Sequence, residues 1–232
     1  IKAALNRKYL LIIRSLGSGK TLIALQVISE YMKQKKGPVL LVGPAHLIQQ
    51  YCDESKKWNC EFLLIKLESP MPLKIDFSKC YCISNALLRR HKVFILRQKW
   101  EMVIVDEFHH GKNPKTQNST IFSELRSSTQ SFIGMTGSPF QNGPSEFFNL
   151  ISLIAGKDVR TACEKYLEFR NKREEGFVKR FLSYFFRARK NRGPVIGIKN
   201  PLKLKELIEK YVDYVSYDEC RIEGKIPIII QE

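Results

Sequence analysis

A short glycine-rich turn near the start of the chain has the residues needed to bind phosphate. It follows an apolar run at residues 9–13 and consists of Gly17, Ser18, Gly19, Lys20 and Thr21. Glycine lets the backbone N–H groups of such a turn approach an anion, and the start of a following helix adds to the attraction. Lys20 would place its charge on the β- and γ-phosphates, and the Thr21 hydroxyl could bind magnesium. The turn predicts a nucleoside-triphosphate site, although in isolation a chance turn would look the same.

Two adjacent acids follow a second apolar run, at residues 102–105, and could complete that site. Asp106 is expected to reach the magnesium ion, usually through water, and Glu107 to orient and deprotonate the attacking water. A bound metal offsets the charge of the two carboxylates. Alone, the pair would be interpreted as an acidic loop after a strand; with the glycine turn it predicts a nucleotide hydrolase. His109 is expected to couple this site to other parts of the chain.

A third turn, at residues 134–142, follows another apolar run and is rich in glycine and hydroxyl side chains. Its Thr136, Ser138 and Gln141 could hydrogen-bond the acids or His109 and so pass the state of the γ-phosphate to a neighbouring surface. Without the other two segments, it would be interpreted as a simple Gly/Ser/Pro turn.

Each of these segments follows a short apolar run, and longer amphipathic patterns lie between the runs. The strands expected are residues 9–13, 39–42, 62–65, 81–83, 102–105 and 131–135. The helices expected are residues 21–33, 47–58, 117–127, 144–154 and 202–212. Apolar runs that alternate with helices are typical of an α/β fold whose mostly parallel sheet has helices on both faces.

The alternation stops near Gly156. Residues 160–192 are rich in arginine and lysine, interleaved with phenylalanine and tyrosine, and are expected to form a helical basic appendage. Its charges could grip nucleic-acid phosphates or form a solvated face, whereas its aromatic residues are expected to form a small core of their own. A break at Gly193 and Pro194 separates this appendage from the rest of the chain, and residues 226–230 are expected to be extended.

Composition narrows the class of protein. The chain has 232 residues, 44% hydrophobic and 27% charged, as in folded globular proteins. Its 39 Lys and Arg against 23 Asp and Glu leave a formal net charge of +16, which favours nucleic acid as a partner or reflects a lysine-rich surface. The six cysteines form no CxxC pair, so we expect reduced, buried thiols, an intracellular location and no zinc site. No apolar run reaches the roughly 20 residues needed to cross a bilayer, and no membrane partner is expected.

Together, the segments resemble the first RecA-like lobe of superfamily-two helicases, and within them the SWI/SNF-related double-stranded-DNA translocases. The resemblance runs through nearly the whole chain and is strongest at residues 10–154. The glycine turn resembles motif I, the acids with His109 resemble a DExH box, and residues 136–150 resemble the stretch most specific to this family. Segments 40–47 and 83–88 resemble motifs Ia and Ib, which contact a DNA backbone. The DNA contacts implied by them are Pro44, Ala45, Ser84 and Asn85.

The chain departs from the family pattern at three places. Arg14 stands where a strict P-loop has glycine, as helicase-type loops allow. Residues 214–217 carry no arginine, although the family often has a pair near this place, before its second lobe. The family's adenine-recognising glutamine segment lies upstream of motif I, and a chain that opens at Ile1 so close to a strand is expected to be a piece of a longer protein.

The resemblance implies a RecA-like P-loop lobe, residues 1–156, that uses ATP and Mg²⁺ to move along double-stranded DNA. Residues 157–193 would be the family's basic helical protrusion. Residues 194–232 would be a connector toward a second RecA-like lobe, which would supply an arginine finger. The fragment alone is then expected to bind nucleotide weakly and to hydrolyse it very slowly. A protein complex is a further candidate partner, in a eukaryotic nucleus or otherwise in the cytoplasm or a virion.

Two other functions fit the same residues. The chain could belong to a strand-separating helicase, including the viral nucleoside-triphosphatase type, or it could be a non-hydrolysing nucleic-acid-binding scaffold. The presence of Lys20, Asp106 and Glu107 argues against the scaffold.

Overall fold

A computed structural model describes residues 1–14, 17–34, 37–139, 144–169 and 195–215. Within these residues, seven strands form one sheet in the order β3-β4-β2-β5-β6-β1-β9, and every neighbouring pair is parallel. Its strands are β1 (Tyr9–Arg14), β2 (Val39–Gly43), β3 (Leu64–Lys66), β4 (Cys80–Ser84), β5 (Met102–Val105), β6 (Ser131–Thr136) and β9 (Val212–Val215). The α/β fold with a parallel sheet is therefore confirmed.

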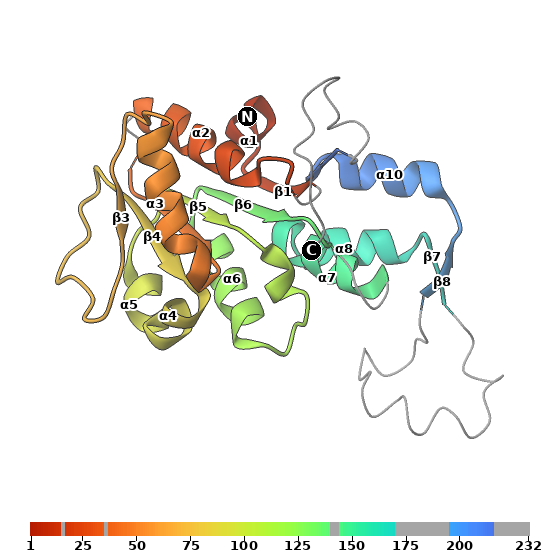
Figure 1. Ribbon diagram of the computed structural model, residues 1–232. Helices are drawn as coiled ribbons and strands as arrows, with labels where there is room; N and C mark the ends of the chain where they lie inside the picture. Colours follow the sequence, from red (N-terminus) through yellow and green to blue (C-terminus); the bar gives the residue numbers. More distant parts are fainter. Residues whose placement is uncertain (15–16, 35–36, 140–143, 170–194, 216–232) are drawn as a thin grey trace, which may run out of the picture.

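Helices cover both faces of this sheet (Figure 1). On one face lie α1 (Lys2–Asn6), α2 (Lys20–Lys33) and α3 (Ile48–Lys57). The other face carries α4 (Asn85–Arg90), α5 (Lys92–Arg97), α6 (Gln117–Ser128), α7 (Pro144–Ala155) and α8 (Lys157–Glu164). Successive strand residues point to opposite faces, so Leu40 packs in one core and Leu41 in the other. Burial on both faces explains why the strands are continuous apolar runs.

The predicted elements agree with the structure to within about two residues, with one exception at the C-terminal end. Helix α10 (Pro201–Glu209) ends before the predicted limit, and Val212 begins strand β9. The N–H of Leu11 donates to the carbonyl of Tyr211 at 2.7 Å, and the parallel pairing with β1 continues from there. Pairing with a distant strand overrides the helical pattern of this segment.

The short helices α1, α4 and α5 were not predicted. Helix α4 follows β4 directly because the hydroxyl of Ser84 accepts a hydrogen bond from the N–H of Leu87 and caps its first turn. Two 3₁₀ turns, η1 (Ala45–Leu47) and η2 (Phe108–Gly111), follow β2 and β5. Helices of one or two turns carry too little periodicity to be read from a sequence.

Residues on both sides of the predicted basic protrusion pack with the lobe. Helix α8 lies in the segment predicted as protrusion, yet its Cys163 is buried in the main core against α7. A second, two-stranded antiparallel sheet of β7 (Leu167–Phe169) and β8 (Val195–Ile198) follows. Helix α10 and β9, predicted as connector, also join the lobe through Leu204 and the sheet. The helical character predicted for the appendage and the extended stretch at 226–230 concern residues 170–194 and 216–232, which lie outside the described residues.

The cysteines of the described residues are free thiols, and those at positions 52, 80, 82 and 163 are buried. Burial raises the pKa of the Cys80 thiol to about 12 and that of Cys163 to about 11. No cluster of three or more potential metal-binding side chains occurs in the part of the chain that the structure describes. In the same part, no helix has the length and apolar character needed to cross a membrane.

Candidate nucleotide-binding site

The three predicted chemical segments meet at one edge of the sheet. The glycine turn follows β1, the acids follow β5 and the hydroxyl-rich turn follows β6. In a parallel sheet the carboxyl ends of the strands lie along the same edge, where open α/β folds bind their ligands. Segments after β2 and β4, predicted to face DNA, reach this edge too.

The glycine turn has the backbone of a phosphate cradle. Gly17 and Gly19 have φ angles of 74° and 76°, in the left-handed region that glycine enters without strain. Gly19 is the residue before helix α2, which begins at Lys20, so the helix N-terminus opens into the turn. Among the described residues, apart from the chain neighbours, no atom lies within 4 Å of the position that a Cβ would take at either glycine, so these residues leave room for an anion.

Asp106 is held in place at both of its carboxylate oxygens. It is only 2% exposed, and its Oδ2 accepts a 2.6 Å hydrogen bond from the hydroxyl of Tyr51. Its Oδ1 accepts from the N–H of Glu107 at 2.8 Å. Burial raises the pKa of Asp106, and these two hydrogen bonds oppose that rise. Burial, together with the nearby Asp106 charge, raises the pKa of Tyr51, so its hydroxyl stays protonated and donates.

Glu107 is joined to the turn after β6 through His109. His109 Nδ1 lies 3.1 Å from Glu107 Oε2 and 3.3 Å from Thr136 Oγ1. Because a carboxylate can only accept, the hydrogen between them belongs to Nδ1. Thr136 is fully buried, and its Oγ1 accepts from the N–H of Ser138 at 3.1 Å. The predicted coupling residues therefore form one chain of contacts; Gln141 lies outside the described residues.

The backbone of Glu107 is itself unusual. Its φ and ψ angles are 49° and 48°, a left-handed conformation that costs free energy for a residue other than glycine. This turn aims the carboxylate toward His109 directly after the strand ends. The hydrogen bond from His109 lowers the pKa of Glu107, and the charge of Lys20 lowers it further. Glu107 is therefore a carboxylate at neutral pH, the form that can accept a proton.

The charge of Lys20 acts on both acids. It opposes the rise in the pKa of Asp106 that burial causes, and it adds to the lowering of the pKa of Glu107 by His109. The same ammonium donates to the carbonyl of Arg14 at 3.4 Å. Lysine, hydroxyl and carboxylate groups around an open glycine turn are the donors that a magnesium–triphosphate complex requires, so these residues fit ATP and Mg²⁺.

Tyr51 was missed by the sequence analysis. It lies on α3, far from the acids in sequence, and nothing in its neighbourhood distinguishes it from an ordinary core tyrosine. Its position depends on Gly43, because a Cβ there would lie 2.6 Å from the Tyr51 oxygen. The pairing of Gly43 at a strand end with an aromatic residue on the next helix is a signal only once the fold is known.

Replacing Tyr51 by phenylalanine is expected to destabilise the protein by about 1–3 kcal/mol, because the buried Asp106 carboxylate loses a donor. It should also raise the magnesium concentration needed for half-maximal nucleotide binding. Urea unfolding and a magnesium titration with a fluorescent nucleotide measure both effects. Tyr81→Phe is the matched control, since that hydroxyl bonds the backbone of Asp76. A Tyr51→Phe protein with wild-type stability and magnesium dependence would contradict this role.

The predicted DNA-facing residues differ in exposure. Ala45 is exposed and Pro44 partly so, at the end of β2. Ser84 is buried and caps α4. Asn85 is only 9% exposed, and its Oδ1 has no hydrogen-bond partner among the residues that the structure describes. Backbone groups and side chains at these two strand ends remain the predicted DNA contacts.

A polar network links the turn after the acids to the helices that follow. Lys112 Nζ lies 3.2 Å from Glu146 Oε2 on α7, and the carbonyl of Lys112 accepts from Asn149 Nδ2 at 2.9 Å. Asn149 Oδ1 in turn accepts from Arg160 on α8. A shift of the η2 turn would therefore be transmitted to α7 and α8.

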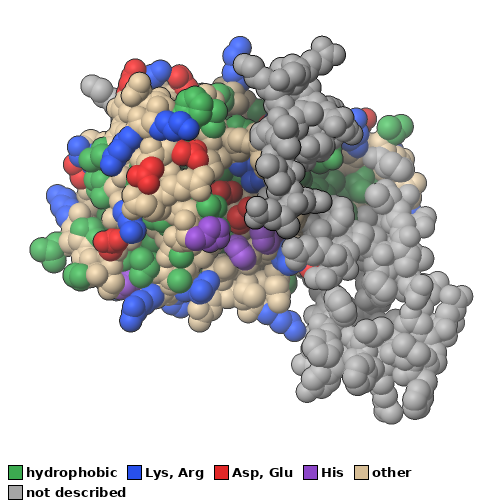
Figure 2. All heavy atoms as spheres, in the orientation of Figure 1, with side chains coloured by type: hydrophobic (Ala, Val, Ile, Leu, Met, Phe, Trp, Pro, Cys, Tyr) green, Lys and Arg blue, Asp and Glu red, His purple; other side chains and the backbone are tan. Residues whose placement is uncertain are grey.

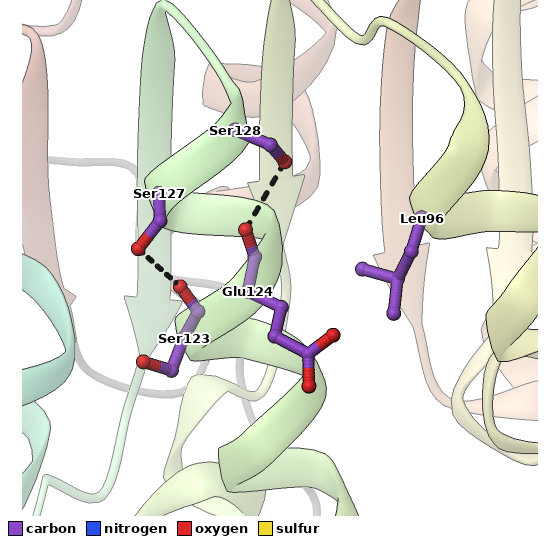
Figure 3. A pocket seen from close by; sticks show the side chains of 5 residues that line it. All are labelled: Leu96, Ser123, Glu124, Ser127 and Ser128. Carbon is purple, nitrogen blue, oxygen red and sulfur yellow. Dashed lines mark hydrogen bonds between the residues drawn. The ribbon is translucent and has the colours of Figure 1, made fainter.

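Two surface hollows lie away from this edge. One, of about 330 Å³, lies between α5 and α6 and is lined by Leu96 and polar side chains of α6 (Figure 3). The hydroxyls of Ser127 and Ser128 donate to backbone carbonyls of the same helix. The other, of about 920 Å³, is lined by residues before β2, β4 and β5, at the opposite edge of the sheet. On the face of the molecule drawn in Figure 2, histidine side chains lie beside acidic side chains near the middle of the view.

Comparison with known proteins agrees with this arrangement. A model of the SNF2-related domain matches residues 10–187, and the chain therefore belongs to the SNF2-related domain family. An uncharacterized ATP-dependent helicase of Bacillus subtilis, YqhH, is 30% identical over 144 residues, covering 60% of this chain and 24% of the relative. The ISWI chromatin-remodeling complex ATPase ISW2 of Saccharomyces cerevisiae is 25% identical over 150 residues, covering 60% and 13%.

A solved structure shares the fold. The Sulfolobus solfataricus SWI2/SNF2 ATPase core in complex with dsDNA matches with a TM-score of 0.65 and 18% identity, over 91% of this chain and 40% of that chain. The RecA-like resemblance is thus confirmed at the level of family and fold. The matched part is no more than 40% of any of these three proteins.

Proposed function

We propose that this chain is the ATP-binding lobe of a DNA-dependent ATPase that moves along double-stranded DNA. The observation that carries the proposal is that Lys20, beside the glycine turn, and the acids Asp106 and Glu107 all follow carboxyl ends of strands in the same parallel sheet. Family membership supports it, since relatives are named as an ATP-dependent helicase and a remodelling ATPase.

Each site residue has a distinct part in hydrolysis. The backbone from Gly17 to Thr21 cradles the phosphates, and Lys20 neutralises charge on the β- and γ-phosphates. Thr21 and Asp106 would hold Mg²⁺, which when bound offsets the negative charge that develops on the phosphates. Glu107 orients the attacking water and accepts its proton, and His109 fixes the direction of the Glu107 carboxylate.

The contact of His109 with Thr136 gives the site an outlet. When the γ-phosphate leaves, Glu107 and His109 lose a neighbour. A shift of His109 would then alter its contact with Thr136 and, through Thr136, the position of Ser138. Backbone contacts at Pro44, Ala45, Ser84 and Asn85 would hold one DNA strand. A second lobe would supply an arginine finger, and its closure and release would drive the step along the duplex.

Two observations favour duplex DNA as the track. The structural neighbour is named as a core in complex with dsDNA. The formal net charge of +16 suits a polyanion. The relative named as a chromatin-remodeling complex ATPase also supports a multiprotein complex and an intracellular location for the full-length protein.

A triplex-disruption assay tests this function against strand separation. The full-length protein is expected to displace a triplex-forming strand from a duplex when ATP is present, while the duplex itself stays paired. Duplex unwinding without triplex disruption would favour the strand-separating helicase. DNA binding without ATP hydrolysis would favour the scaffold. An ATP-free reaction is the control in each case.

A further inference from the structure

Arg14, at the end of β1, makes an ion pair with the last strand of the sheet. Its Nη2 lies 2.8 Å from Asp213 Oδ2, and its Nη1 lies 3.4 Å from the carbonyl oxygen of the same residue. The guanidinium thus contacts both the side chain and the backbone of Asp213. Arg14 is also the residue at which this chain departs from a strict P-loop, where glycine would stand. In the structure this arginine has a partner, Asp213.

This ion pair is more sheltered than the exposed pair between Lys66 and Glu68. The side chains of Arg14 and Asp213 are 14% and 32% exposed. The side chains of Lys66, which is in the other edge strand β3, and of Glu68 are 41% and 64% exposed. A partly buried pair with planar guanidinium geometry is held more firmly than an exposed lysine pair, because less of its attraction is screened by water.

A second arginine fastens the same strand at its start. Arg7 Nη1 donates to the carbonyl of Glu209 at 3.0 Å and approaches the carbonyl of Val212 at 3.5 Å. Between the two arginines, β9 pairs in parallel with β1. Strand β9 is therefore anchored to β1, the strand that leads into the phosphate-binding turn.

Arg14 also contacts the central lysine of the site. Its carbonyl accepts from Lys20 Nζ at 3.4 Å, so the residue that Asp213 fixes is the residue against which Lys20 rests. A displacement of β9 would therefore change the position of Arg14 and, through it, the environment of the Lys20 ammonium.

We propose that Arg14 and Asp213 are positioning residues that set the phosphate-binding turn from strand β9. Through these two residues, nucleotide affinity depends on the position of strand β9. The inference rests on the proposed function, because it assumes that the turn binds a nucleoside triphosphate. It assigns a task to two residues that contact no phosphate themselves.

A charge-swap experiment on the full-length protein tests the proposal. The variants are Asp213→Asn, Arg14→Gln and the double variant Arg14→Asp with Asp213→Arg, and Glu68→Gln is the matched control in the exposed pair. The dissociation constant of a fluorescent ATP analogue is measured with magnesium, beside KM and kcat for ATP and the melting temperature. Each single variant should weaken nucleotide binding and raise KM by about three- to tenfold, with a smaller change in kcat. The double variant should recover part of that loss.

The outcomes separate three readings. Wild-type nucleotide affinity in both single variants would overturn the proposal. A lower melting temperature and a lower kcat at unchanged KM and affinity would also overturn it, because they show a loss of folded protein only. If the wild-type protein binds the analogue but does not hydrolyse ATP, the proposed function fails, while the affinity measurements still decide the role of the pair.

Discussion

Replacing Glu107 by glutamine is expected to lower the ATP turnover of the full-length protein by about 10²–10⁴-fold, the usual contribution of a positioned general base. The amide keeps the size of the side chain but cannot accept the proton of the attacking water. Nucleotide affinity should change little, because the role proposed for Glu107 is to act on the attacking water and not to bind the phosphates. Steady-state hydrolysis with saturating DNA, beside equilibrium nucleotide binding, separates the two effects.

Glu124→Gln provides the matched control for this variant. Glu124 is an exposed glutamate on α6, away from the candidate site, and its replacement should leave turnover unchanged. Glu107→Gln protein that hydrolyses ATP at the wild-type rate would contradict the assignment of the base. That result would leave the catalytic base of this site unassigned.

Replacing Lys20 by alanine is expected to weaken nucleotide binding by about ten- to hundredfold, because a charge-assisted contact to phosphate is lost. The same change removes a positive charge that opposes the burial-driven rise in the pKa of Asp106 and adds to the lowering of the pKa of Glu107 by His109. Turnover should therefore fall together with affinity, unlike the effect of Glu107→Gln. Titration of a fluorescent ATP analogue and steady-state hydrolysis report the two losses.

The control for the Lys20 variant lies on the same helix. Lys33 stands at the other end of α2, where it pairs with Glu30 at 2.8 Å and is about half exposed. Lys33→Ala should bind nucleotide as the wild type does. Equal affinity in the Lys20→Ala and wild-type proteins would remove the glycine turn from the binding site.

The central strands and the segments that follow them were predictable from local patterns. Fully buried parallel strands are continuous apolar runs, and the limits of β5 match the prediction at both ends. The glycine turn and the paired acids each have a signature within a few residues. Their meeting at one edge then follows from the parallel order of the strands.

Contacts between distant segments could not be predicted in this way. Tyr51 reaches Asp106 across 55 positions of sequence, and Arg14 reaches Asp213 across 199. Neither residue type nor spacing marks such pairs, because the fold alone brings them together. Strand β9 shows the same effect, since its pairing with β1 decided between a helix and a strand.

The coupling of the acids to the end of β6 through His109 was predictable only in part. The spacing of His109 after Asp106 indicated a role, but the sequence could not say which atoms it would join. Glu107 has a left-handed backbone, and both its carboxylate and the Thr136 hydroxyl lie within 3.3 Å of the same nitrogen, Nδ1 of His109. The spacing of His109 therefore indicated that it contacts this site, whereas the contact with Glu107 is known only from the structure.

The most direct test of the central claim is a crystal structure of the protein with Mg²⁺ and a non-hydrolysable ATP analogue. The triphosphate is expected on the backbone of the glycine turn, with Lys20 against the β- and γ-phosphates and the metal between the Thr21 hydroxyl and Asp106. Nucleotide bound elsewhere, for example in the hollow before β2 and β4, with the glycine turn empty, would contradict the claim.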